Sequence, residues 1–182
     1  MISMRVLVAI LALAGLPLSG QAALDVGEAA PDFTTVAALD GKEFRYRLSE
    51  SLTKGPVVLY FYPAAFSVGC SIEAHAFAEA IDQFAAEGAT VIGVSADDID
   101  VLKKFSVKSC QGKFPVAADP GMDIIKSYDA ALNTRPEYAN RITYVIAPGG
   151  KVALQYTSLN PEGHIAKALA AVRRLRQKPP AR

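Results

Sequence analysis

The sequence has little of several features that would place it in a familiar class. Its 182 residues include two cysteines, two histidines and no tryptophan. The cysteines form no Cys-x-x-Cys pair, which excludes the usual dithiol redox motif, and their spacings to the histidines fit no zinc-finger pattern. Lys+Arg total 19 against 18 Asp+Glu, so no surplus of positive charge points to nucleic acid. We expect no metal, no cofactor and no nucleic-acid partner.

The first 22 residues have the pattern of a secretory signal peptide. Arg5 precedes an apolar run at 6–18, and Gly20 and Ala22 are small residues suited to a cleavage site. A membrane anchor is the alternative, but the run is shorter than the roughly 20 residues that a spanning helix needs. We expect cleavage after Ala22, no stable membrane insertion and an exported protein of the bacterial periplasm. Export would also allow the two cysteines to form a disulfide.

The full chain is 51% hydrophobic and 20% charged, and this composition suits one globular domain with a complete core. We place this domain at residues 23–176 and a disordered tail at 177–182. Apolar runs predict strands at 57–62, 90–95, 114–118, 142–146 and 152–156, and helical spacing predicts helices from Cys70 to near Gly88, from Asp98 through Phe105, at 122–128 and from Asn160 onward. This order predicts an α/β fold with a mixed central sheet flanked by helices.

Cys70 follows the first predicted buried strand and begins the first long predicted helix. Free backbone N–H groups and partial positive charge at a helix N-terminus favour the thiolate form of a cysteine, which is the nucleophile. The apolar stripe of this helix includes Phe77 and Phe84 and leaves Glu73 off it. Cys70 is therefore predicted to be reactive, and the alternative is a structural disulfide with Cys110.

The segment around Cys70 resembles the active-site signature of peroxiredoxins, Pro-x-x-x-Ser/Thr-x-x-Cys. Pro63, Ser67 and Cys70 stand at the three defined positions, and the aromatic strand before them is similar to that of the Q-type subfamily. Further blocks at 91–95, 103–105, 114–115 and 141–146 resemble the family in the same order. The resemblance implies a thioredoxin-like fold and a thiol peroxidase that reduces hydrogen peroxide and organic hydroperoxides through a cysteine sulfenic acid. It also implies a thioredoxin-like reductant and a monomer.

The resemblance assigns four side chains to the reaction. Cys70 would be the peroxidatic nucleophile, and Ser67 would hydrogen-bond the thiolate and the peroxide. Pro63 would shield the pocket from water, and Arg141 would keep the thiolate ionised and stabilise charge on the peroxide oxygens. Each residue also has a plainer interpretation: Pro63 as a strand terminator, Ser67 as a turn residue, and Arg141 as a solvated charge at a strand end.

Three further polar residues are weighed as members of the site: Glu73, His75 and His164. Glu73 has a precedent in the family, but it could serve only to complement the helix dipole. His75 is expected on the surface of the helix, and His164 is expected in a capping turn. We therefore place both histidines outside the site.

The second cysteine departs from the common Q-type pattern. Many relatives have a resolving cysteine five residues after the first, and His75 occupies that position here. The resemblance then implies that Cys110 resolves the sulfenic acid as an intramolecular disulfide with Cys70, after some unwinding of the helix turn. The alternatives are a one-cysteine mechanism that uses an external thiol, and a Cys110 that stays buried. An exported thiol–disulfide oxidoreductase and a non-enzymatic domain of the same fold are the competing functions.

Overall fold

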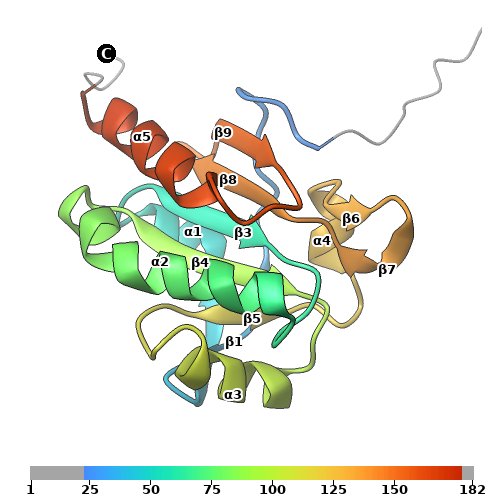
Figure 1. Ribbon diagram of the computed structural model, residues 1–182. Helices are drawn as coiled ribbons and strands as arrows, with labels where there is room; N and C mark the ends of the chain where they lie inside the picture. Colours follow the sequence, from blue (N-terminus) through green and yellow to red (C-terminus); the bar gives the residue numbers. More distant parts are fainter. Residues whose placement is uncertain (1–22, 178–182) are drawn as a thin grey trace, which may run out of the picture.

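The computed structural model describes residues 23–177, so the predicted signal peptide at 1–22 and residues 178–182 of the predicted tail lie outside the described residues. A seven-stranded sheet forms the centre, and helices cover both of its faces (Figure 1). The strands are β1 (Thr34–Leu39), β2 (Lys42–Arg47), β3 (Val57–Phe61), β4 (Thr90–Ser95), β5 (Val116–Ala118), β6 (Ala131–Leu132), β7 (Arg135–Ala139), β8 (Ile142–Ile146) and β9 (Val152–Thr157). The helices are α1 (Leu48–Leu52), α2 (Val68–Ala86), α3 (Ile99–Lys108), α4 (Asp123–Ser127) and α5 (His164–Gln177).

The sheet is mixed, as the sequence predicted. Its strand order is β2-β1-β5-β4-β3-β8-β9. Strands β3, β4 and β5 run parallel to one another, while β8 and β9 form the predicted antiparallel hairpin beside β3. The β1–β2 hairpin and the separate β6–β7 pair are additions that the sequence analysis did not predict.

Strand β3 is buried along its whole length because it lies between two hydrophobic cores. Side chains alternate along a strand, so Val58 and Tyr60 pack into the core under α2, α3 and α5. Val57, Leu59 and Phe61 pack into the core that includes residues of α1 and α4. This continuous apolar strand fixes the point at which the chain leaves the sheet and enters α2.

The last helix begins later than the sequence predicted. Asn160 does not start the helix: its Oδ1 accepts a hydrogen bond from the Glu162 N–H at 3.1 Å, within a turn. Gly163 then adopts a left-handed conformation with φ +94°, and α5 begins at His164. Gln177, which the sequence analysis assigned to the tail, is the last residue of this helix.

No helix within residues 23–177 is both long and apolar enough to cross a bilayer. In the same part of the chain, no group of three or more His, Cys, Asp or Glu side chains is placed to hold a metal ion.

Candidate active site

Cys70 lies where the sequence placed it, in the first turn of α2 and directly after the exit from β3. Its side chain is 1% exposed. Ser67 is the N-cap residue, and its backbone carbonyl accepts a hydrogen bond from the Ser71 N–H at 2.9 Å. The Ser67 hydroxyl donates to the Ala64 carbonyl at 3.0 Å rather than capping the helix. The thiol is therefore held at the positive end of a 19-residue helix and away from bulk water.

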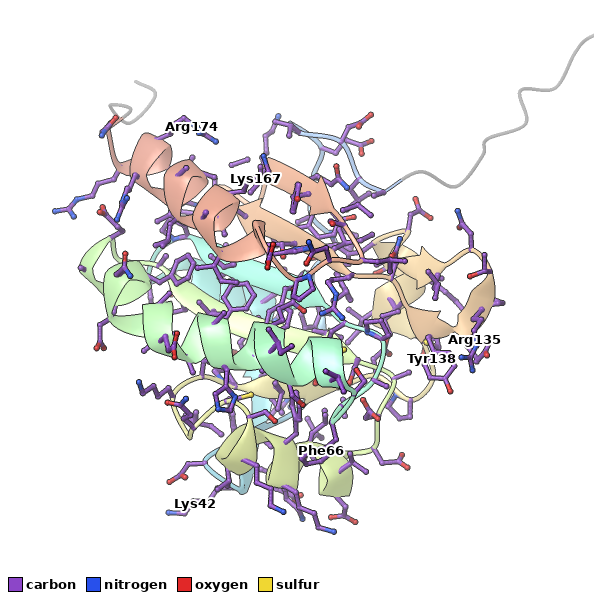
Figure 2. All side chains as sticks on the ribbon, in the orientation of Figure 1. Lys42, Phe66, Arg135, Tyr138, Lys167 and Arg174 are labelled. Carbon is purple, nitrogen blue, oxygen red and sulfur yellow. The ribbon has the colours of Figure 1, made fainter. Side chains whose placement is uncertain are left out.

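The loop that joins β3 to α2 is held by its neighbours. Pro63 is half-buried at the end of the strand. Asp97, which the sequence analysis did not assign to the site, accepts hydrogen bonds from the Ala65 N–H at 2.7 Å and from the Ser95 hydroxyl at 2.8 Å. Phe66 has a left-handed φ of +64° and packs edge-on against Phe105 of α3, between α2 and α3 (Figure 2). Such a backbone persists in a non-glycine residue only where surrounding contacts fix it.

Arg141 reaches Cys70 from just before β8. Its Nη2 lies 3.4 Å from the Cys70 Sγ, and its Nε donates to the Leu159 carbonyl at 3.0 Å. Arg141 is 4% exposed, so the interpretation as a solvated charge is wrong. Burial alone would lower the pKa of Arg141, but the negative charges of Glu73 and Cys70 raise it, so the guanidinium stays charged. A Cβ on Gly69 would lie 3.1 Å from Nη2, which shows how closely the guanidinium approaches the helix.

The place of Glu73 off the apolar stripe suggested that its side chain points to solvent, but the structure shows otherwise. Glu73 is fully buried, and its Oε2 accepts a short hydrogen bond from the Arg141 Nη1. Burial raises the pKa of Glu73 to about 7, against the opposing effect of Arg141. Helical spacing failed here because the partner that keeps this carboxyl inside the protein lies 68 residues away in the sequence.

His164 is also buried, and it is the first residue of α5 rather than part of the expected capping turn. It is 0% exposed, its Nδ1 lies 2.8 Å from the Thr143 Oγ1, and its Nε2 lies 3.0 Å from the Ser158 carbonyl oxygen. The signal was available, because His164 shares helical spacing with Ala168 and Val172, and both of these are buried. His75 is exposed on α2, as predicted.

Cys110 follows α3 and is fully buried, and both cysteines are free thiols in this structure. Burial raises the pKa of the Cys110 thiol, so it is uncharged at neutral pH. The two cysteines belong to one hydrophobic core together with Tyr60 and Tyr62. The pKa of each tyrosine is raised well above its ordinary value, chiefly by burial.

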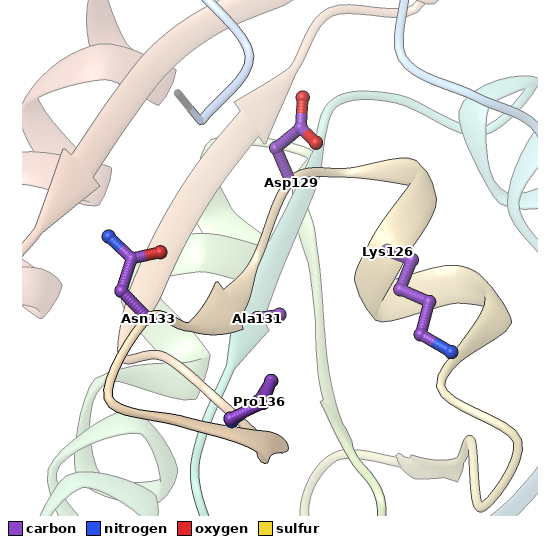
Figure 3. Close-up of a pocket in the computed structure, with 5 residues that line it drawn as sticks. All are labelled: Lys126, Asp129, Ala131, Asn133 and Pro136. Carbon is purple, nitrogen blue, oxygen red and sulfur yellow. The ribbon is translucent and has the colours of Figure 1, made fainter. Parts of the chain in front are cut away.

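A separate small pocket of about 180 Å³ lies beside the β6–β7 pair (Figure 3). It is lined by Lys126, Asp129, Ala131, Asn133 and Pro136. None of the predicted site residues lines it.

Comparisons with known proteins show which family the chain is similar to. The AhpC/TSA family matches residues 26–155. Peroxiredoxin Q, chloroplastic, of Populus jackii is 36% identical over 156 residues, which cover 85% of this chain and 70% of the relative. The Arabidopsis thaliana protein of the same name is 37% identical over 149 residues, 81% of this chain and 67% of the relative. The fold is also similar to the crystal structure of peroxidoxin BcpB from Mycobacterium tuberculosis, with a TM-score of 0.73 and 30% sequence identity. The matched region covers 82% of this chain and 96% of the BcpB chain.

Proposed function

The chain belongs to the AhpC/TSA family as a thiol peroxidase of the peroxiredoxin Q type, and on that premise we propose that Cys70 is the residue that attacks the peroxide. The observation that carries this assignment is the contact of 3.4 Å between the Cys70 Sγ and the Arg141 Nη2 at the N-terminus of α2. In this position the thiolate is stabilised by a fixed cation and by the helix dipole together.

The proposed first step is a two-electron transfer. The Cys70 thiolate forms a bond to one oxygen of the hydroperoxide while the O–O bond breaks. The sulfur is oxidised to sulfenic acid, and the leaving oxygen, reduced to hydroxide or alkoxide, takes a proton and departs as water or an alcohol. Arg141 stabilises the negative charge that passes from sulfur to the leaving oxygen.

Two loop residues complete the proposed pocket. The Ser67 hydroxyl uses its hydrogen in the bond to Ala64, so its oxygen is free to accept a hydrogen bond from the peroxide O–H. Pro63, at the exit from β3, has no N–H to hydrate and shields the approach to Cys70 from water. These roles would orient the peroxide for attack in line with the O–O bond.

We propose that Cys110 resolves the sulfenic acid. Its thiol would attack the sulfur of Cys70, forming the disulfide and releasing water, and a thiol reductant would then restore both thiols. Because Cys110 is fully buried, the turn that follows α3 and the first turn of α2 have to open for the sulfurs to meet. An external thiol that reduces Cys70 directly is the alternative.

A Cys110→Ala protein separates the two mechanisms. We expect its Cys70 to be oxidised by one equivalent of peroxide at close to the wild-type rate, because Cys110 takes no part in that step. Turnover with thioredoxin as the only reductant is expected to fall by about tenfold or more, since no disulfide forms for the dithiol to reduce. Stopped-flow oxidation and a coupled turnover assay measure the two steps. Unchanged turnover with thioredoxin would show that an external thiol reduces Cys70 directly.

The reductant and the location of the enzyme are part of the same proposal. A peroxide substrate and a thiol reductant follow from the family. We propose that the reductant is thioredoxin-like, that the enzyme acts as a monomer, and that removal of residues 1–22 accompanies export to the periplasm. Expression of the full chain in a bacterium followed by intact mass measurement of the periplasmic fraction is expected to show a protein that begins at Ala23. A full-length protein confined to the cytoplasm would contradict this proposal.

A further inference from the structure

A buried carboxyl oxygen behind the thiolate has no hydrogen-bond partner. Glu73 Oε2 binds Arg141, but Oε1 is buried without a donor and lies 3.7 Å from the His164 Nδ1. Glu73 and His164 are both 0% exposed. An ionised carboxylate oxygen left without a donor in such surroundings is costly, so its presence needs an explanation.

The contacts of His164 identify which ring nitrogen has a proton. Nε2 lies 3.0 Å from the Ser158 carbonyl oxygen, which can only accept, so Nε2 donates. With Nε2 protonated, the neutral ring leaves Nδ1 as an acceptor, and the Thr143 hydroxyl at 2.8 Å donates to it. The single lone pair of Nδ1 is then used by Thr143, so neutral His164 has no hydrogen to donate to Glu73 Oε1, and an ionised Oε1 would stay without a donor.

The charge balance of the cluster supports the same protonation state. The Cys70 thiolate and an ionised Glu73 would together place two negative charges against the single positive charge of Arg141. A proton on Glu73 leaves one thiolate and one guanidinium, which balance each other. Because a net buried charge is far less favourable than a compensated pair, the protonated form of Glu73 is the one that coexists with the thiolate.

We propose that Glu73 is protonated on Oε1 in the resting enzyme, beside a neutral His164 that offers Oε1 no donor, so that Arg141 directs its full charge to the Cys70 thiolate. Glu73 and His164 are then positioning residues that act through Arg141. The inference rests on the proposed roles of Cys70 and Arg141 in the reaction.

The titration behaviour of the surrounding groups agrees with this arrangement. Burial raises the pKa of Glu73 to about 7, and burial, assisted by the charge of Arg141, lowers the pKa of His164. The groups next to the Glu73 carboxyl are Arg141, which also contacts Cys70, and His164 at the start of α5, while Tyr60 on β3 belongs to the same buried region. The pKa of Tyr60 is raised well above its ordinary value by burial, so this hydroxyl is neutral. Below about pH 7 Glu73 is uncharged, and above it a second negative charge competes with the thiolate for Arg141.

The protonation states can be measured without changing Glu73. The chain has two histidines, and replacing the exposed one, His75→Gln, leaves His164 as the single imidazole. We expect 15N NMR of this reduced protein at pH 6 to 8 to show a neutral ring with its proton on Nε2. A doubly protonated ring at pH 7 would overturn the proposal, because His164 and not Glu73 would then hold the proton.

Infrared spectroscopy locates the other proton. At pH 6 we expect a carbonyl band of a protonated carboxylic acid in the His75→Gln protein that is missing from the same protein with Glu73→Gln. Asp119 is a second carboxyl with a pKa raised by burial, and any band from Asp119 stays in both spectra. If the band is the same with and without Glu73, Glu73 is ionised and the proposal fails. Neither spectrum depends on peroxidase activity, so this failure is distinct from a failure of the proposed function.

The kinetic test compares rates at two pH values. Relative to the His75→Gln parent, we expect Glu73→Gln to raise the ratio of the Cys70 oxidation rate at pH 8 to that at pH 6 by about three- to tenfold, because glutamine cannot gain the competing charge. A merely structural role for Glu73 would lower both rates and leave the ratio unchanged. A ratio within twofold of the parent would overturn the proposal, whereas a parent whose Cys70 is not oxidised would overturn the proposed function instead.

Discussion

Replacement of Cys70 with serine is expected to lower peroxide consumption by about four orders of magnitude or more, to the rate without enzyme. A serine hydroxyl is not ionised at neutral pH, and its oxygen cannot take up the peroxide oxygen as the thiolate sulfur does when it becomes a sulfenic acid. The surroundings of residue 70 change little, since the substitution replaces one small buried side chain with another. Peroxide consumption in a coupled assay measures the effect, with circular dichroism as the check on folding.

The matched control for this substitution is Cys110→Ala, which removes the other buried thiol. It is expected to retain the first oxidation step, as argued above. If the Cys70→Ser protein kept more than a few per cent of the wild-type rate, Cys70 would not be the peroxidatic residue.

Replacement of Arg141 with methionine is expected to slow oxidation of Cys70 by about 10²- to 10³-fold. Arg141 Nη2 is the cationic donor at 3.4 Å from the sulfur, and removal of one such donor costs this much in comparable sites. Methionine preserves much of the buried volume without the charge. The second-order rate constant from stopped-flow measurements under single-turnover conditions tests the expectation.

The same substitution is expected to lower the free energy of unfolding by roughly 1–3 kcal/mol, because it leaves the buried Glu73 carboxyl without its hydrogen-bond donor. The loss should be larger at pH 8 than at pH 6. Because the pKa of Glu73 in the folded protein is raised above its ordinary value, the folded protein loses stability as pH rises through that pKa. Arg141 opposes this rise in pKa, so its removal raises the pKa further and makes the loss of stability larger at high pH. Arg174→Met, at an exposed position on α5, is the control and should change neither property. Oxidation within threefold of wild type would contradict the role given to Arg141.

The parts of this molecule that sequence reasoning recovered depend on local signals. The buried apolar run of β3, the stop at Pro63 and the helical spacing after Cys70 are contained in one short stretch, so their placement was predicted. The mixed sheet was predicted for the same reason, because its parallel strands β3 and β4 are continuous apolar runs.

The β1–β2 hairpin was missed although its turn has a clear signature. Asp40 and Gly41 join the strands, and both have a left-handed φ, of 48° and 75°. Asp-Gly between two strands is a strong hairpin signal. The flanking residues gave little support, because only one residue of β2 is buried and its hydrophobic alternation is weak.

The cluster behind Cys70 could not be assembled from the sequence. Glu73, Arg141 and His164 come from separate elements, and each of them alone reads as a surface residue. Their burial is explained by partners distant in the sequence: Arg141 donates a hydrogen bond to Glu73, and His164 is bonded to Thr143 and Ser158. Such pairing is a property of the folded state, which is why helical spacing put Glu73 on the wrong side of α2.

The central claim is that Cys70 is oxidised first and Cys110 resolves it. The direct test treats fully reduced mature protein with one equivalent of hydrogen peroxide, quenches at successive times, and follows intact mass and peptide maps. The account predicts rapid loss of two hydrogens with a Cys70–Cys110 linkage, and no such linkage in Cys70→Ser. If Cys70 reacted no faster than an ordinary exposed thiol, or Cys110 were oxidised first, the account would be contradicted.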